Sequence, residues 1–181
     1  MGKKVYVIAG SARKGGNTDI LCDEFIRGAQ DAGHETEKVY IVDKNISGCV
    51  GCFACQKNSG ICSVKDDMEE LNAKMMEADV IVFASPVYFY TWNSQTKMVV
   101  DRSFSIEKRA QNKTFYLISA ASAPSEMYMD TLKLSFQQYI GCFRAGGNKI
   151  GGYVFGPGTS DRGDVRHTRA MKAAYEAGKM I

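Results

Sequence analysis

Short apolar runs alternate along the whole chain with stretches that have helical periodicity. Five runs are near-continuously apolar and rich in β-branched or aromatic residues: 5–9, 39–42, 80–84, 114–119 and 150–155. Runs of this kind are typical of parallel strands that are covered on both faces of a sheet. The pattern therefore predicts five buried strands.

Amphipathic stripes fill the intervals between these strands. Their apolar positions recur at helical spacing and are Leu21, Phe25, Ala29 and Ala32 in the first stripe, Met68, Leu71, Met75 and Ala78 in the second, and Leu132, Phe136, Tyr139, Ile140 and Phe143 in the third. Gly33 is placed to end the first helix, and Asp66 with Glu69 has the spacing of a capping box. A shorter helix is expected after Asn93 or Ser94.

Alternating strands and helices predict an α/β fold built from right-handed βαβ crossovers. A last helix is expected to begin after Asp164 and to run to the C-terminus. Five strands fit a doubly wound parallel sheet with strand order 2-1-3-4-5, in a single domain over residues 1–181. Ligands of such sheets bind at the carboxyl ends of the strands, where the strand order reverses. The loops after the first, third and fourth strands should therefore carry the function.

The composition is that of one soluble domain. Hydrophobic residues make up 45% and charged residues 24% of the 181 positions, which is ordinary for a globular protein and argues against disorder. The net charge of +3, with no arm rich in Lys and Arg, argues against nucleic acid as a partner. No apolar run reaches the length of a membrane span, and the opening residues lack the pattern of a signal peptide, so we expect a cytoplasmic location and no membrane contact.

The loop at 10–18 joins the first strand to the first helix and is rich in groups that bind phosphate. A helix N-terminus offers unpaired N–H groups and the positive end of a dipole, and glycines let the backbone approach a ligand closely. The candidate phosphate-binding residues are Ser11, Arg13, Gly16, Asn17 and Thr18.

Other interpretations of this loop fit less well. Gly10 and Gly15 have the spacing of a Walker motif, but Gly16 and Asn17 stand where that motif needs Lys and Ser or Thr. Ala12 replaces the second glycine of a dinucleotide fingerprint. A plain solvated turn, with Asn17 or the next residue as the helix N-cap, remains an alternative. The concentration of donors at a switch-point loop favours phosphate binding.

Aromatic residues crowd the loop that follows the third strand. Four aromatic side chains lie within the segment 85–94, directly after Pro86. Flat rings can flank the ring system of a ligand, although a local apolar plug over the sheet edge explains them equally well. The loop after the fourth strand, 120–123, contains only small residues that would let a ligand lie close to the backbone.

Four of the six cysteines lie in one glycine-containing loop at 48–63. Cys49, Cys52 and Cys55 are spaced by two residues each, and Cys62 follows after six more. Thiolates at this spacing can wrap a 4Fe–4S cluster. A zinc site usually joins two C-x-x-C pairs across a longer spacer, and four free thiols are the plainest alternative. The spacing and the reducing compartment favour the cluster. Cys22 and Cys142 fall in predicted helices and are expected to be small core residues.

Several of these patterns resemble those of the NADPH-dependent FMN reductase superfamily. The Ser11-x-Arg13-x-x-x-Asn17-Thr18 segment is similar to its phosphate loop, and Ser85-Pro86-x-Tyr88 to its second loop. The compact cysteine motif, ending here in Asp66-Asp67-Met68, resembles that of the iron–sulfur flavoproteins in this superfamily. The resemblance implies a flavodoxin-like fold that binds FMN, with its phosphate in the loop at 10–18 and a 4Fe–4S cluster on the four loop cysteines.

The resemblance also implies which residues surround the flavin ring. They are Pro86, Val87, Tyr88, Phe89 and Asn93 in the second loop, with Ala120, Ala121 and Ser122 of the third loop close to the flavin edge. Because the flavin performs the chemistry, no side chain is expected to be a catalytic acid or base.

The implied function is electron transfer through FMN. NADPH or NADH is the expected donor, and a quinone, a free flavin or another small oxidant is the expected acceptor. A cluster would favour a ferredoxin-type protein donor, because a cluster handles single electrons. The resemblance further implies a homodimer or homotetramer. Two alternatives stay open: a non-catalytic electron carrier, which the mildly basic charge disfavours, and a zinc-stabilised binding module on the same fold.

Overall fold

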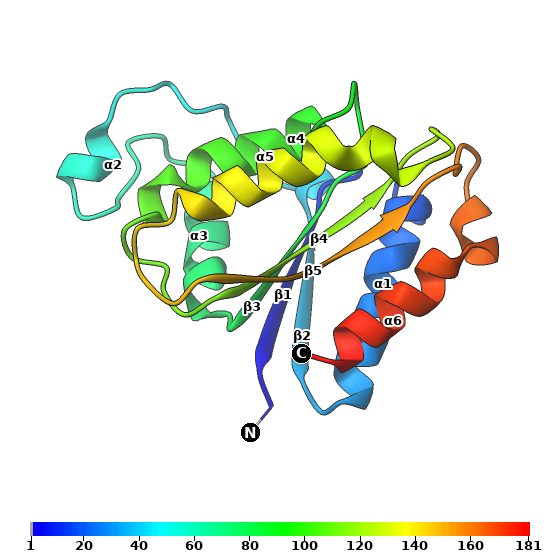
Figure 1. Cartoon of the computed structure of the whole chain (residues 1–181). Coiled ribbons are helices and arrows are strands. Elements are labelled where there is room, and N and C mark those ends of the chain that lie inside the picture. Colours follow the sequence, from blue (N-terminus) through cyan, green and yellow to red (C-terminus); the bar gives the residue numbers. More distant parts are fainter. Residues whose placement is uncertain (1) are drawn as a thin grey trace.

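The computed structural model describes residues 2–181 and contains a five-stranded parallel sheet between two layers of helices (Figure 1). The strands are β1 (Lys4–Ala9), β2 (Glu35–Tyr40), β3 (Val80–Ala84), β4 (Thr114–Ala120) and β5 (Lys149–Gly156). Their order in the sheet is β2-β1-β3-β4-β5, and all neighbouring pairs are parallel. The predicted doubly wound, flavodoxin-like sheet is thus confirmed, with its switch point between β1 and β3.

The two helical layers bury opposite faces of the sheet. One layer is formed by α3 (Met68–Glu77), α4 (Ser94–Arg102) and α5 (Asp130–Gly141), and the other by α1 (Asn17–Asp31) and α6 (Arg169–Lys179). Side chains alternate between the two cores along each strand. In β1, Tyr6 and Ile8 join the first core, whereas Val5 and Val7 join the second. Burial on both faces explains why these strands are near-continuously apolar.

The second strand lies earlier in the chain than its apolar pattern indicates. β2 begins at Glu35, and the last two residues of the predicted strand 39–42 belong instead to the short 3-10 helix η1 (Ile41–Asp43). β2 is an edge strand that pairs only with β1, and several of its side chains face solvent. Its first residues can therefore be polar, so the apolar pattern that marks buried strands does not include them.

The predictions for the N-termini of three helices had different outcomes in the structure. α6 begins at Arg169, because residues Asp164–His167 form the separate 3-10 helix η4. α4 begins at Ser94, and the Asn93 side chain accepts the N–H of Thr96, as a predicted cap should. The Asp66 carboxylate accepts the N–H groups of Met68 at 3.1 Å and Ser47 at 2.9 Å and pairs with Arg102, but it does not bind Glu69, so the predicted capping box does not form.

The cysteine loop projects from the sheet beside the α3–α4–α5 layer and includes the short helix α2 (Ala54–Lys57) (Figure 1). The remaining 3-10 helices are η2 (Ser103–Ile106), which follows α4, and η3 (Glu126–Met129), which precedes α5. Within residues 2–181, no helix combines the length and the apolar character that a membrane crossing requires.

Candidate functional site

The three predicted loops meet at one cleft of about 300 Å³ at the switch point of the sheet. Its walls contain the predicted residues Ser11, Arg13, Gly16, Asn17, Thr18, Pro86, Val87, Tyr88, Ala120, Ala121 and Ser122. The fifth strand adds Thr159, Ser160 and Arg162 from the loop that follows it. Residues that are far apart in sequence therefore surround a single ligand-sized space.

The loop at 10–18 is folded tightly against the carboxyl ends of β1 and β3. A Cβ atom on Gly10 would lie 1.8 Å from the Thr96 hydroxyl and 2.9 Å from the Ala84 carbonyl, so only glycine fits there. Gly16 is the N-cap of α1 and offers no side-chain cap, which removes the alternative of Asn17 or its neighbour as N-cap. The first N–H groups of α1 are thus available to an anion in the cleft.

Asn17 fixes the first loop to the loop after β5. Its Nδ2 donates to the Asp161 carbonyl at 2.8 Å, and its Oδ1 accepts the backbone N–H of Gly163 at 2.9 Å and of Val165 at 3.3 Å. The side chain therefore has protein partners on both polar atoms. Its predicted role as a phosphate donor stays a prediction, and these contacts also fix the side chain at the wall of the cleft.

The loop after β5 was not predicted as part of the site. Arg162 donates from Nε to the Gly15 carbonyl at 3.2 Å and also reaches the Lys14 carbonyl. Thr159 is buried and donates from its hydroxyl to the Gly156 carbonyl at 2.9 Å. The one signal in the sequence is the polar run Thr159–Arg162, which lies in the loop after the last strand of a parallel sheet.

A buried carboxylate supports the first loop from below. Asp19 is 3% exposed and accepts the Gly15 N–H at 2.6 Å and the Lys38 ammonium at 2.9 Å. Burial lowers the pKa of Lys38, but hydrogen bonds with Asp23, Tyr40 and Asp19 outweigh it and raise the pKa overall. Lys38 therefore stays charged and offsets part of the negative charge of Asp19 and Asp23 beneath the loop.

The aromatic loop forms an exposed hairpin at the rim of the cleft. Tyr88 and Thr91 exchange backbone hydrogen bonds of 3.0 and 3.1 Å, and the two residues between them have φ of 48° and 67°. Non-glycine residues in this region are strained. Phe89 is 98% exposed and does not line the cleft, so the hairpin is not an apolar plug over the sheet edge. Tyr90 stacks on Tyr128 with ring centroids 6.2 Å apart.

Asn93 also lies outside the cleft, and it holds the first two loops together. It is 1% exposed, and its Nδ2 donates to the Gly10 carbonyl at 2.6 Å. Its Oδ1 accepts the hydroxyls of Ser85 at 3.1 Å and Thr96 at 2.6 Å. Phe89 and Asn93 are thus the two predicted flavin-lining residues that the structure does not bring into the cleft wall.

The third loop forms the small-residue side of the cleft. The Ala120 carbonyl accepts the Val87 N–H at 3.0 Å, and the Ala121 N–H donates to the Gly156 carbonyl at 3.1 Å. Each loop is thereby fixed to its neighbour by a backbone hydrogen bond. A wall held in this way is formed before any ligand arrives, which lowers the entropic cost of binding.

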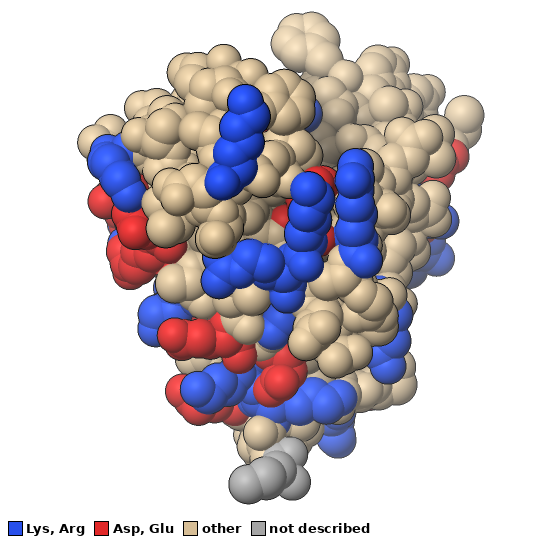
Figure 2. Space-filling view, turned by 90° about the vertical axis from the view of Figure 1, so that its left-hand side faces the viewer, with Lys and Arg blue, Asp and Glu red and all other residues tan. Residues whose placement is uncertain are grey.

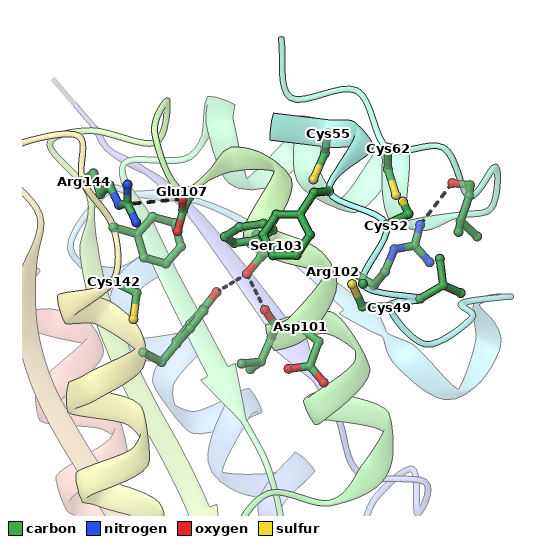
Figure 3. Close-up of a pocket in the computed structure, with 18 of the residues that line it drawn as sticks. Cys49, Cys52, Cys55, Cys62, Asp101, Arg102, Ser103, Glu107, Cys142 and Arg144 are labelled. Carbon is green, nitrogen blue, oxygen red and sulfur yellow. Dashed lines mark hydrogen bonds and ion pairs between the residues drawn. The ribbon is translucent and has the colours of Figure 1, made fainter. Parts of the chain in front are cut away.

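The four loop cysteines line a second cavity of about 950 Å³ between the cysteine loop and helices α4 and α5 (Figure 3). Throughout the described residues, cysteines are free thiols. Burial raises the pKa of Cys55, with smaller effects from Cys62 and Cys49, whereas a hydrogen bond with Ser63 lowers the pKa of Cys52. Nowhere in residues 2–181 do three His, Cys, Asp or Glu side chains come together as ligands of one metal ion.

The two cysteines outside this loop lie in different environments. Cys22 is fully buried in the α1–α6 core, as predicted. Cys142 is exposed at the end of α5 and lines the second cavity, so the prediction of a core residue is wrong there. The α5 stripe faces the sheet with Leu132 and Phe136, and Cys142 follows the last helical turn on the outward side.

A flavodoxin-like sheet with a preformed cleft at its switch point defines the class of a doubly wound α/β domain that binds a ligand at the carboxyl ends of its strands. The sequence profile of NADPH-dependent FMN reductases matches residues 3–149. The chain therefore belongs to the NADPH-dependent FMN reductase family.

Relatives and solved structures agree with this assignment. An iron–sulfur flavoprotein of Methanosarcina thermophila is 29% identical, and the alignment covers 98% of this chain and 93% of that protein. Another, from Methanocaldococcus jannaschii, is 44% identical over 55% of this chain and 51% of its own length. The chain thus spans about half the length of some of these relatives. An NAD(P)H:quinone oxidoreductase from Methanothermobacter marburgensis shares the fold, with a TM-score of 0.81 at 13% identity and coverage of 99% and 96%.

Proposed function

We propose that this protein binds FMN in the switch-point cleft and passes electrons from NAD(P)H or a reduced protein to a small acceptor such as a quinone or a flavin. The convergence of three separate loops on one preformed cleft carries the proposal. Family membership and the relatives' names support a flavin-dependent redox reaction.

The residues of the cleft suit a flavin with a phosphate tail. The first N–H groups of α1, the Ser11 hydroxyl and the Arg13 guanidinium offer donors for a phosphate dianion. The flat ring system would lie between Pro86, Tyr88 and the small residues of 120–122. FMN supplies the redox chemistry when bound, and these residues bind it, orient it and keep it at the rim where a second molecule can reach it.

We further propose that Cys49, Cys52, Cys55 and Cys62 hold a 4Fe–4S cluster. The donors fit such a group because all four thiols open onto one cavity. A mononuclear zinc site fits less well, since the thiols are not drawn together around a single ion. The names of the relatives, iron–sulfur flavoproteins, support the cluster.

The proposal includes a protein donor of the ferredoxin type, a homo-oligomeric state and a cytoplasmic location. Figure 2 shows Lys and Arg side chains interspersed with Asp and Glu on the side of the molecule that carries α2 and α3. The ferredoxin-type donor is proposed because a cluster handles single electrons. Exposed Tyr88 and Phe89 at the rim of the cleft would be covered in a homodimer or homotetramer.

Anaerobic purification followed by flavin, iron, sulfide and zinc analysis tests the cofactors together. We expect one FMN and a single 4Fe–4S cluster per chain, and turnover of NADPH or NADH with a quinone. A coloured protein without turnover would favour the electron carrier. Zinc without iron or flavin would favour the binding module and reject the proposal.

A further inference from the structure

Arg102, at the end of α4, is buried beneath the cysteine loop and binds both of its ends. Its side chain is 1% exposed. Nη1 donates to the Ser47 carbonyl at 2.8 Å, before the first cysteine, and Nη2 donates to the Val64 carbonyl at 3.1 Å, after the last one. Both groups also bind Asp66, at 2.7 and 2.9 Å. One guanidinium therefore closes the loop at its base.

The third nitrogen of this guanidinium has no partner. Arg102 Nε is buried, and among the described residues no acceptor satisfies it. An unsatisfied buried donor is destabilising and calls for an explanation. The other unsatisfied buried side-chain atom there, Asn72 Oδ1, lines a cavity under the same loop together with Cys62. Both unpaired groups thus lie where the loop meets the body of the protein.

Cys62 is the cysteine next to this free donor. Burial lowers the pKa of Arg102, but Asp66 and the adjacent Cys62 outweigh it and raise that pKa. Figure 3 shows Arg102 among the loop cysteines, and its side chain lines the same cavity as Cys62. A thiolate sulfur that binds a cluster is an acceptor for N–H groups, and such hydrogen bonds help to set the reduction potential.

We propose that Arg102 is a positioning residue for the cluster: it fixes both ends of the cysteine loop and donates its free Nε–H to the sulfur of Cys62. This inference rests on the proposed cluster in the loop. A positive donor stabilises the more negative, reduced form of the cluster, so Arg102 raises its reduction potential. It also slows loss of the cluster, because the ends of the loop cannot separate.

Redox titration of the intact protein, followed by electron paramagnetic resonance, tests the inference with the variant Arg102→Lys. Lysine keeps the positive charge opposite Asp66 but cannot reach both loop ends and Cys62 together. We expect one-electron reduction to become about tenfold less favourable, a potential lower by about 59 mV. We also expect iron loss to a chelator to be about tenfold faster.

Two further variants separate this role from a merely structural one. Asp66→Asn breaks the same buried ion pair but leaves the Nε–H in place, so the potential should not fall. Arg144→Gln removes a cation that lines the same cavity and is 71% exposed, and it should change neither the potential nor iron loss. The inference is wrong if the cluster has the same reduction potential in wild type and Arg102→Lys. It is also wrong if Asp66→Asn lowers that potential as much as Arg102→Lys does. Neither result would argue against the cluster itself. If the wild-type protein holds FMN but no iron, the proposed cluster and this inference both fall.

Discussion

Asn17 and Gly163 are joined across the candidate FMN cleft by a 2.9 Å hydrogen bond from the Gly163 N–H to the Asn17 Oδ1. The Asn17 amide also donates to the Asp161 carbonyl. The phosphate loop and the loop after β5 are therefore one unit, although more than 140 residues separate them in the sequence. This link fixes one wall of the cleft to the loop after β5.

Replacing Asn17 by alanine should weaken FMN binding without unfolding the domain. The loss of a hydrogen-bonded link worth about 1.4 kcal/mol corresponds to a tenfold increase in Kd. Quenching of flavin fluorescence on binding measures this Kd. Asn45→Ala is a suitable control, because Asn45 is exposed and its contacts use the backbone. Equal affinity in wild type and Asn17→Ala would contradict the positioning role.

Gly10→Ala should reduce both stability and flavin binding. The added Cβ would lie 1.8 Å from the Thr96 hydroxyl and 2.9 Å from the Ala84 carbonyl, and the backbone carbonyl cannot move away easily. Overpacking of this kind costs about 1–3 kcal/mol. Denaturant unfolding measures the loss, and Gly146→Ala, where nothing lies within 4 Å, serves as the control. An unchanged unfolding midpoint in Gly10→Ala would show that the loop can accommodate a Cβ atom at this position.

Asp66→Asn should destabilise the protein in a pH-dependent manner. Burial raises the pKa of Asp66, but Arg102 and the N–H groups of Ser47 and Met68 outweigh it and lower the pKa overall. A lowered carboxyl pKa adds stability above the unfolded-state value of about 3.9, and that stability is lost as the pH falls through the lower folded-state pKa. Because the pair is buried, the loss at neutral pH should be about 3 kcal/mol or more.

Urea unfolding of wild type and Asp66→Asn between pH 3 and 8 checks this dependence. The gap in the free energy of unfolding should be constant above about pH 5 and shrink below about pH 4. Asp101→Asn is the matched control, because its ion pair with Lys97 is exposed on α4, the helix that ends at Arg102, and should contribute less than about 1 kcal/mol. A gap that does not vary with pH would mean that the Asp66 charge is not what stabilises the loop.

Serine replacements at Cys49, Cys52, Cys55 and Cys62 should each remove most of the iron and leave FMN in place, because the two cavities are lined by different residues. Iron and flavin analysis of anaerobically purified variants measures both. Cys142→Ser is the control, since Cys142 lines the cysteine cavity but follows the end of α5, outside the motif. Retention of iron in all four variants would exclude these thiols as its ligands.

The sheet could be predicted because parallel strands buried on both faces carry a signal in every residue. The start of the edge strand could not be predicted in this way, because part of that strand meets solvent. Its first positions therefore accept polar residues such as Glu35 and Glu37. The loops at the switch point could be predicted because they follow buried strands and not the edge strand. Each follows a strand whose position was clear, and topology alone brings them together.

Side-chain roles within the site were harder to predict. A sequence shows that Asn17 and Asn93 stand in the right loops, but not that protein groups occupy their amides. Arg162 was missed because its partners, the carbonyls of the first loop, are backbone groups that any residue could supply. The closing contacts of Arg102 depend likewise on backbone carbonyls at both ends of a folded loop.

Comparison of FMN with riboflavin is the most direct test of the proposed phosphate cradle. The two ligands share the ring system, and only FMN carries the phosphate that the first turn of α1 and Arg13 should bind. Two charge-assisted hydrogen bonds worth about 1.5 kcal/mol each give a preference of about 100-fold. Fluorescence titration of flavin-free protein should show this preference for FMN. Equal affinity for both ligands, or no binding of either, would contradict the assignment of the cleft.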